Sequence, residues 1–381
     1  ANNFLPNYKS NTEKGAYLGY SVRKLILTKL GILKETDRDS YSFKRIDTAG
    51  TLLLELYREL WSIFQRNVSL KIDNDFKFHF KDFGNDIKNL INDENSKKVF
   101  NPKSLDNIVK SFGSVFGTGL SGRQGIVQDL NRNAMLGTLS HTRRISNPLP
   151  AGSKSLGPRK LHNSQWGFVC PTESPDGGNV GIINHLSIMA KVSTNISETG
   201  IIECLKDINL LFIEDTVAED MYNNTPVFLN GKLIGLYENP AFLFKYLKLL
   251  KLNSIININT SISWNIKTNE FHVFTDSGRI IRPIFFLKTD KNGDKYNELI
   301  SGDISYIENW KKAIHGYLYG KVDNLDFATP NYFREELAVL KSDETYLEIL
   351  QNSASVIEYI DSTESENALI GRDMKSFTKE N

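Results

Sequence analysis

Residues 113–194 carry no long run of apolar side chains at helical or strand spacing, and this limits what the chain can fold into. The segment is rich in glycine, proline, serine and asparagine, which favour turns and loops over regular elements. It predicts one short helix near residues 126–136, followed by loops. A segment of this kind stays ordered only when a larger scaffold clamps it, so the rest of the chain must supply that scaffold.

The N-terminal flank predicts helices over residues 15–30, 51–65 and 104–112. Apolar side chains recur there at helical spacing, and Gly31 stands where a C-terminal cap would end the first helix. The apolar stripes of the first two helices consist of Tyr17, Leu18, Val22 and Leu25, and of Leu53, Leu56, Leu60 and Phe64.

After the loop-rich segment the pattern changes to short alternating runs. The Asn-Gly pair at 230–231 predicts a hairpin, because both turn positions need positive φ. An Asn-Pro pair predicts the start of a helix over residues 239–252, since asparagine caps a helix and proline suits its first turn. A second hairpin is predicted around 276–278, and a further helix near 336–341. This half of the chain therefore predicts an α+β module.

The composition is that of an ordinary globular protein. The 381 residues are 40% hydrophobic and 24% charged, and the length predicts two or three compact units. No apolar run approaches the roughly 18 residues that cross a bilayer, and the N-terminus lacks the layout of a secretion signal. Cys170 and Cys204 lack CxxC spacing, which favours a reducing, intracellular compartment. Because the sequence opens on Ala1 and closes on GRDMKSFTKEN, we expect an internal piece of a longer protein.

Charge is sorted along the chain, although the net charge is only +1. Seven acids and one lysine lie between residues 341 and 369, whereas one acid, Asp129, lies between residues 111 and 165. Guanidinium groups on glycine-rich backbone suit phosphate contacts. From charge alone a solvated loop surface is an equally good interpretation. The seven basic residues between 111 and 165 are Arg123, Arg132, Arg143, Arg144, Lys154, Arg159 and Lys160.

Other candidate chemistry is weak. Cys170 and His162 could form a nucleophile and base only if the fold brought them together, and a lone cysteine is more often a small packed hydrophobe. The carboxylate pairs at 37 and 39 and at 73 and 75 have metal-ligand spacing but read as solvated turn residues. Gly320-Lys321 lacks the Ser or Thr of a phosphate-binding loop. The sequence thus offers no self-contained active site and no metal site.

Residues 130–190 read LNRNAMLGTLSHTRRISNPLPAGSKSLGPRKLHNSQWGFVCPTESPDGGNVGIINHLSIMA. This stretch closely resembles the fork region of the second-largest, β-type subunit of multi-subunit DNA-directed RNA polymerases. The family pattern runs approximately LSHxRR, a loop, and then RxxHxxxxGxVCPxE followed by a Ser/Thr-Pro-Glu/Asp-Gly turn. This chain supplies Leu139-Ser140-His141, Arg143-Arg144, Arg159, His162, Gly167, Val169-Cys170-Pro171, Glu173 and Ser174-Pro175-Asp176-Gly177.

The resemblance extends over nearly the whole chain. DRDSYSFKRIDTAG resembles the family's signature late in the protrusion, FTDSGRIIRPIF its external-region hairpin, and VIEYIDSTESENALIG its acidic segment. It implies an α+β multidomain fragment with a helical protrusion end, a loop-rich fork and mixed α/β external regions. The implied domains are the end of the protrusion (1–112), the fork (113–194), external region 1 (195–288) and external region 2 (289–381).

The resemblance also implies which residues lie near nucleic acid. In such polymerases the fork lies beside the catalytic centre, where cations would face template, RNA or incoming triphosphate, and Glu173 would orient neighbouring cations. The loop at 145–154 corresponds to a wedge at the downstream DNA edge, stiffened here by two prolines. The loop at 117–125 is shorter than in nuclear enzymes, and its role is left open. The implied site residues are Arg123, Arg132, His141, Arg143, Arg144, Lys154, Arg159, Lys160, His162 and Glu173.

The implied activity is template-directed ribonucleotide polymerisation by a complex. No catalytic residue and no cofactor is expected on this chain, which would be inactive alone, and the Mg²⁺ ligands belong to the family's largest subunit. The expected partners are that largest subunit, smaller assembly subunits, template DNA, nascent RNA and ribonucleoside triphosphates, with no membrane.

The wording PTESPDGGNVGIINHL departs from the nuclear PxETPEGQ and suggests a large DNA virus. The expected location is then the host cytoplasm, in a viral factory, or the virion, and otherwise the nucleus or cytoplasm. Two alternative functions stay open. One is a stand-alone nucleic-acid-binding protein, and the other is a purely structural module that docks subunits.

Overall fold

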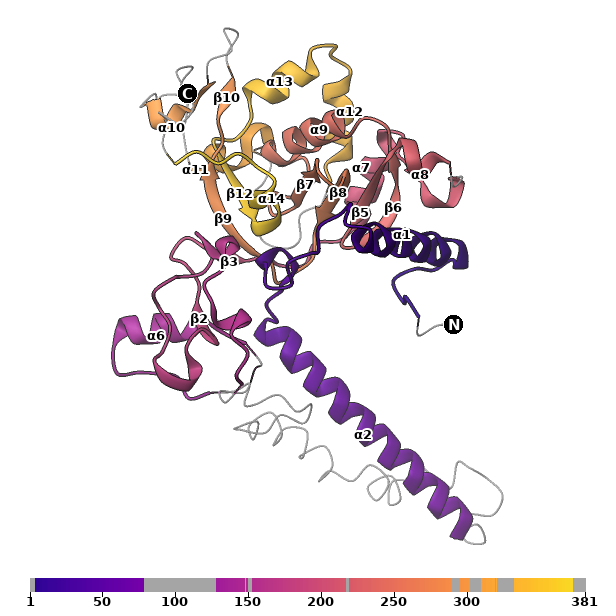
Figure 1. Cartoon of the computed structure of the whole chain (residues 1–381), viewed down its shortest axis with the longest axis vertical. Coiled ribbons are helices and arrows are strands. Elements are labelled where there is room, and N and C mark those ends of the chain that lie inside the picture. Colours follow the sequence, from indigo (N-terminus) through magenta and orange to yellow (C-terminus); the bar gives the residue numbers. More distant parts are fainter. Residues whose placement is uncertain are drawn as a thin grey trace. The chain divides into compact units, whose positions relative to one another are not determined.

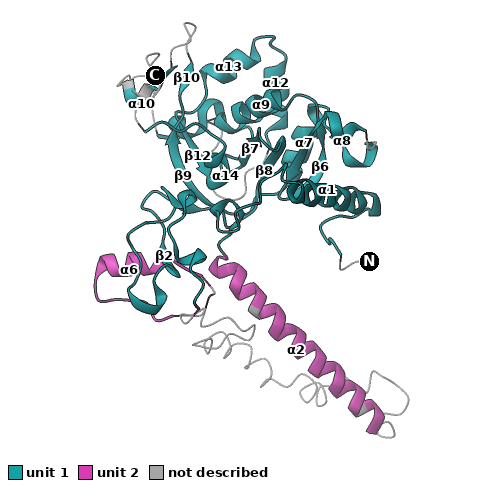
Figure 2. Ribbon diagram, in the orientation of Figure 1, with its two compact units in different colours: residues 1–46, 154–381 teal, residues 47–153 magenta. Residues whose placement is uncertain are grey.

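The computed structural model describes residues 4–78, 128–147, 149, 153–216, 219–289, 295–301, 310–318, 320 and 332–372. Two compact units emerge, one of residues 1–46 with 154–381 and one of residues 47–153 (Figure 2). Helices and mixed sheets together confirm the predicted α+β class (Figure 1). Among the described helices, none combines the length and the apolar character needed to cross a membrane.

A five-stranded sheet forms the centre of the first unit. Its order is β4-β6-β5-β8-β7, and every neighbouring pair is antiparallel except β5 with β8. Asn230 and Gly231 take positive φ values of 49° and 79° between β5 and β6, which confirms the hairpin predicted there. The strands are β4 (Leu211–Phe212), β5 (Thr225–Leu229), β6 (Lys232–Tyr237), β7 (Ser261–Asn265) and β8 (Glu270–Phe274).

Helix α9 (Pro240–Leu252) supplies much of the core beside this sheet. The Asn239 side chain accepts a hydrogen bond from the Phe242 amide, as predicted for a capping asparagine. Leu243, Leu247 and Leu250 recur at helical spacing and are fully buried. Because Val227 and Phe271 of the sheet belong to the same apolar cluster, α9 and the sheet form one core.

The hairpin predicted around 276–278 is wrong. Strand β9 (Ile280–Phe285) does not pair with β8. It lies between β3 (Lys191–Val192) and β12 (Ile357–Asp361) in a separate, three-stranded sheet. The turn is diverted because Gly278, at φ +84°, donates its N–H to the Ser193 carbonyl and accepts from the Ile46 amide at 2.8 Å. Residues 191–192 therefore join the residues after 279 through the pairing of β3 with β9.

The remaining described elements of this unit are short. Helix α12 (Arg334–Lys341) confirms the helix predicted near 336–341. The other helices are α7 (Thr199–Asp207), α8 (Asp220–Asn223), α10 (Glu298–Ser301), α11 (Trp310–His315), α13 (Tyr346–Asn352) and α14 (Ser362–Glu366). The other strands are β2 (Ile183–His185), β10 (Lys288–Thr289) and β11 (Lys295–Tyr296), and the 3-10 turns include η1 (Tyr41–Phe43), η6 (Ile213–Asp215) and η8 (Gly316–Leu318).

Helix α1 (Asn11–Lys29) confirms the first predicted helix and packs against the five-stranded sheet at β5 and β8. The Tyr20 ring lies 5.4 Å from the Phe228 ring, and the Tyr20 hydroxyl donates to Glu270. The Lys24 ammonium lies 2.7 Å from the same carboxylate, whose side chain is only 6% exposed. Burial by itself would raise the pKa of Glu270, but the hydrogen bonds to it prevail and lower that pKa from 4.5 to about 2.

The second unit contains α2 (Ala49–Phe78), α6 (Met135–Thr142) and β1 (Arg144–Ser146). Helix α2 confirms the second predicted helix and extends it to Phe78, whereas the helix predicted at 104–112 lies outside the described residues. The helix predicted near 126–136 is wrong in place, since residues 128–134 are not helical. Asn131 accepts a bond from the Asn133 amide, and this local turn competes with a helix.

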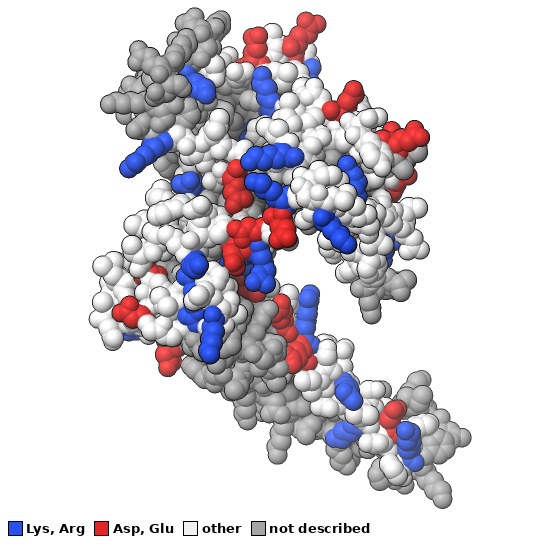
Figure 3. Space-filling model, viewed as in Figure 1, with Lys and Arg blue, Asp and Glu red and all other residues white. Residues whose placement is uncertain are grey.

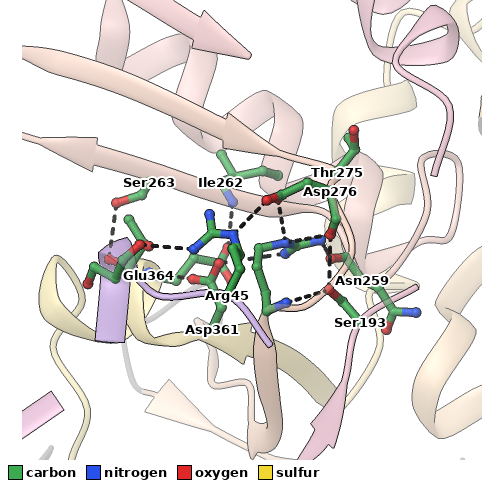
Figure 4. A network of polar contacts seen from close by, with 12 residues as sticks. Arg45, Ser193, Asn259, Ile262, Ser263, Thr275, Asp276, Asp361 and Glu364 are labelled. Carbon is green, nitrogen blue, oxygen red and sulfur yellow. Dashed lines mark hydrogen bonds and ion pairs between the residues drawn. The ribbon is translucent and has the colours of Figure 1, made fainter. Parts of the chain in front are cut away.

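A buried polar network joins the five-stranded and the three-stranded sheet of the first unit. The Lys251 ammonium of α9 lies 3.0 and 2.9 Å from the Glu364 carboxylate oxygens, and Glu364 also accepts from the Ile262 amide at the start of β7. The Arg279 guanidinium donates to the carbonyls of Asp276 and Asn259 at 3.0 and 2.9 Å. Figure 4 shows Glu364 beside Ile262 and the turn around Asp276.

We expect Lys251→Met to lower the free energy of unfolding by about 3 kcal/mol, because it leaves two buried carboxylates, Glu358 and Glu364, to share the single cation Lys248. Urea denaturation of the full chain measures the loss. Lys267→Met is the matched control, since Lys267 is exposed and its substitution should cost under about 0.5 kcal/mol. Equal losses for the two variants would contradict a structural role for the buried pair.

The Glu270 carboxylate should make the stability of the chain pH-dependent. Its pKa of about 2 lies below the ordinary 4.5, so its contribution is present above pH 4.5 and is lost as pH falls towards 2. We expect Glu270→Gln to destabilise the chain at pH 7 by about 3 kcal/mol at most, and by progressively less on acidification. Urea denaturation across this pH range checks it; a difference that stays constant with pH would refute the assignment.

Candidate nucleic-acid interface

Residues 153–192, here called the fork loops, consist of short turns fixed to a few buried side chains. They contain η3 (Gly157–Arg159), η4 (Asn163–Gln165) and η5 (Gly177–Asn179) besides β2 and β3. Phe168 and Val169 are each 1% exposed, and Val169 forms a bridge with Leu186. The loops are thus anchored on a scaffold, as their composition predicts.

Arg159 closes the glycine-rich turn at 174–183. Its Nη1 donates to the carbonyls of Gly178 and Val180 at 2.8 and 2.9 Å. A Cβ at Gly181, whose φ is +70°, would lie 2.3 Å from the Arg159 carbonyl oxygen. The backbone therefore needs glycine here, and part of the donor capacity of Arg159 serves the fold.

Glu173 lies on the exposed side of the same turn. The ring Nδ1 of His185 lies 3.2 Å from the Glu173 carbonyl oxygen and 3.8 Å from the Glu173 carboxylate. The Glu173 side chain is 45% exposed. Ser174 donates to the Ile183 carbonyl and accepts from the Gly181 amide. The turn is therefore held from inside while the carboxylate of Glu173 faces outward.

His162 is held by residues far from it in sequence. Its Nε2 lies 2.7 Å from a carboxylate oxygen of Asp37, and its Nδ1 accepts from the Ser164 amide. The hydrogen bond from His162 lowers the pKa of the Asp37 carboxyl. Sequence reasoning interpreted Asp37 as a solvated turn residue and missed this contact, because nothing local links positions 125 residues apart.

In the second unit, His141 serves the local fold. Its Nδ1 accepts from the Asn131 amide at 3.0 Å and its Nε2 lies 3.1 Å from the Gln128 side-chain oxygen, so both ring nitrogens are engaged. Arg143 ends α6 and is half-buried, while Arg144 is exposed on β1. Arg132 is exposed and has no polar contact among the described residues. Their nucleic-acid contacts stay predictions.

Lys154 and Lys160 of the fork loops are exposed, and within the described ranges their side chains take part in no hydrogen bond or ion pair. Figure 3 shows basic side chains over the region of β2. Arg123 and the loop at 117–125 lie outside the described residues. The two lysines can therefore meet an anion without breaking any contact of the described fold.

No nucleophile and base pair forms at Cys170. Its sulfur lies 3.5 Å from the Thr172 hydroxyl, which lowers the pKa of the thiol, and the ring nitrogens of His162 are engaged elsewhere. Across the described parts of the chain, no three histidine, cysteine or acidic side chains gather as a metal site would require. The arrangement of the described residues can bind anions.

Comparison with known proteins gives two family matches inside the chain. Residues 128–192 match the model described as RNA polymerase Rpb2, domain 3, and residues 227–288 match RNA polymerase Rpb2, domain 4. The first covers the fork loops together with α6 and β1. The second covers most of β5 and all of β6 to β9.

Whole-chain similarity points the same way. The chain is 32% identical to the DNA-directed RNA polymerase II subunit RPB2 of Meyerozyma guilliermondii, over 96% of this chain and 28% of that protein. It is 34% identical to that of Schizosaccharomyces pombe, over 76% of this chain and 23% of that protein. The DNA-directed RNA polymerase subunit Rpo2 of Sulfolobus acidocaldarius is 27% identical, over 95% and 33%. The chain thus spans between 23% and 33% of the length of these relatives.

Gly181→Ala and Gly177→Ala form a matched pair that tests the close approach of Arg159. Both glycines have positive φ, so alanine costs roughly 1 kcal/mol of backbone strain at either position. A Cβ at Gly177 meets nothing within 4 Å, whereas one at Gly181 meets the Arg159 backbone. We expect Gly181→Ala to cost about 1–3 kcal/mol more in urea denaturation and to speed proteolysis of the turn. Equal effects would rule out a tight contact.

Proposed function

Because the chain belongs to the family of second-largest subunits of DNA-directed RNA polymerases, we propose that it works as part of such a subunit during transcription. Its fork would lie along the nucleic acids near the active centre, and its external regions would form the scaffold behind the fork. The observation that carries the proposal is the pair of unpaired exposed lysines, Lys154 and Lys160, which lie on the segment matched to Rpb2 domain 3.

The fork residues would contribute by position and charge. Lys154 and Lys160 would contact phosphates, which fixes the register of a strand without reading its sequence. Arg143 and Arg144 would face template, RNA or incoming triphosphate. Glu173 would orient neighbouring cations beside the nucleotide path, because a carboxylate close to phosphates is otherwise repulsive. The loop at 145–154 would act as a wedge at the downstream DNA edge.

Template-directed ribonucleotide addition would be a reaction of the whole complex. Its partners would be the largest subunit, smaller assembly subunits, template DNA, nascent RNA and ribonucleoside triphosphates. Mg²⁺ held by the largest subunit would supply the electrophilic chemistry of nucleotide transfer. This chain would bind and orient substrates.

Transcription by this subunit would take place in the nucleus or cytoplasm. The wording PTESPDGGNVGIINHL supports a finer proposal, a large DNA virus, for which transcription would take place in the host cytoplasm or the virion.

The lysine contacts can be tested in an assembled polymerase that carries Lys154→Ala and Lys160→Ala together. We expect weaker nucleic-acid binding, and a log–log salt dependence whose slope falls by about 1 for each lost phosphate contact. Filter binding and elongation assays over a salt series measure both. Lys267→Ala, on the turn between β7 and β8, is the control and should leave the slope unchanged.

Two other results would redirect the proposal. Unchanged salt dependence and elongation would favour a purely structural docking module. Tight binding by the isolated chain, well below the roughly 10⁻⁴ to 10⁻⁶ M of non-specific contacts at physiological salt, would favour a stand-alone nucleic-acid-binding protein.

A further inference from the structure

A groove of about 420 Å³ opens in the first unit between the fork loops and α14. Trp166 lies on its wall with 55% of its surface exposed. The lining combines charged, polar and apolar side chains and includes His162, Trp166, Arg282, Glu366, Ala368 and Ile370.

The walls of the groove are fixed by bonds between distant parts of the chain. The Tyr41 amide donates to the Ser164 hydroxyl at 2.9 Å, and the Ser40 hydroxyl donates to Glu366 at 2.7 Å. Residues of η1 and its N-cap thereby connect the fork side of the groove with the α14 side. The groove is a formed feature of this unit.

Arg282 of β9 stands in this wall without a polar partner. Its guanidinium lies 5.1 Å from the centre of the Phe168 ring, and a Cβ at Gly167 would lie 2.5 Å from its Nη1. Gly167, at φ +82°, makes room for it. Within the described residues the guanidinium makes no hydrogen bond or ion pair, and its Nε is buried.

An unpaired, half-buried guanidinium is costly, because burial removes water that no protein acceptor replaces. Burial accordingly lowers the pKa of Arg282. The planar guanidinium is packed against an aromatic ring and keeps donor N–H groups that suit a carboxylate or a phosphate. The site is therefore ready for an anion.

We propose that this groove receives a peptide segment from another part of the same polymerase subunit, with a carboxylate on Arg282 and an apolar side chain on Trp166. A carboxylate is favoured over nucleic acid because Glu366 lines the groove and Asp37 pairs with His162 at its edge. Those two acids would repel a polyanionic backbone, whereas one carboxylate can approach the cation alone.

The choice of the same subunit rests on the proposed function, since it requires a longer chain around this one. The relatives are about three to four times as long as the part matched here, which covers 28% and 33% of two of them. A segment tethered within one subunit has an effective concentration near the millimolar range, so even a weak contact would be occupied.

Photo-crosslinking in the assembled polymerase tests the proposal. A benzophenone amino acid replaces Ala368, which lines the groove and is exposed. After irradiation we expect a crosslink, identified by mass spectrometry, to a segment of the same subunit that lies outside the 381 residues and carries a carboxylate beside an apolar side chain. Arg282→Ala should weaken docking about tenfold and lower the yield, Arg282→Lys should retain part of it, and Lys267→Ala should leave it unchanged.

Several results would overturn the proposal. They are a crosslink to nucleic acid, a crosslink to another subunit, no crosslink outside this chain, or a yield that does not change in Arg282→Ala. If Arg282→Ala prevents folding, the proposal is still tested by the crosslink of the chain that keeps Arg282 and by the crosslink yield of Arg282→Lys. Elongation by the same preparation separates the two proposals. A polymerase that elongates but gives no crosslink would refute this inference alone. A polymerase that does not use this subunit in transcription would refute the proposed function.

Discussion

The ion pair between Lys251 and Glu364 lies where the five-stranded and the three-stranded sheet of the first unit meet. Both side chains are almost fully buried, so neither charge can be relaxed by water if the other is lost. Lys248 and Glu358 extend the pair into a four-residue cluster, which ties α9 to β12 and α14. Burial raises the pKa of Glu364 whereas the two lysines oppose that rise, which shows how strongly the carboxylate depends on its partners.

The position of the fork loops depends on that junction. Strand β3 forms the C-terminal end of the fork loops and pairs with β9, and β9 is held on its other side by β12. The turn before β9 is fixed by Arg279, which is 2% exposed and bonded to backbone carbonyls. A loop segment without a core of its own is thereby anchored at one end on a buried polar network, a rigid base for the groups that we propose to meet nucleic acid.

The basic residues of the fork divide into those that serve the fold and those that remain available. Arg159 bonds the carbonyls of its own turn, and both ring nitrogens of His141 are engaged. Lys154 and Lys160 remain exposed and unpaired among the described residues. Arg282 is the opposite case, because it carries a charge that the described fold leaves unsatisfied in a groove. The number of basic residues alone therefore overstates how many cations are available to bind an anion. The contacts that each cation already makes decide whether it is available.

Local sequence determined much of this protein. Asn230-Gly231 specified a turn, Asn239-Pro240 specified the start of α9, and the spacing of apolar residues specified α1 and α2, because each signal acts within one element. The fork motif indicated the family. Only the tertiary structure decided that β8 and β9 enter different sheets, that Asp37 meets His162, and that Arg282 faces a groove without a partner. Those outcomes depend on contacts between residues far apart in the chain, and neither local propensity nor spacing encodes them.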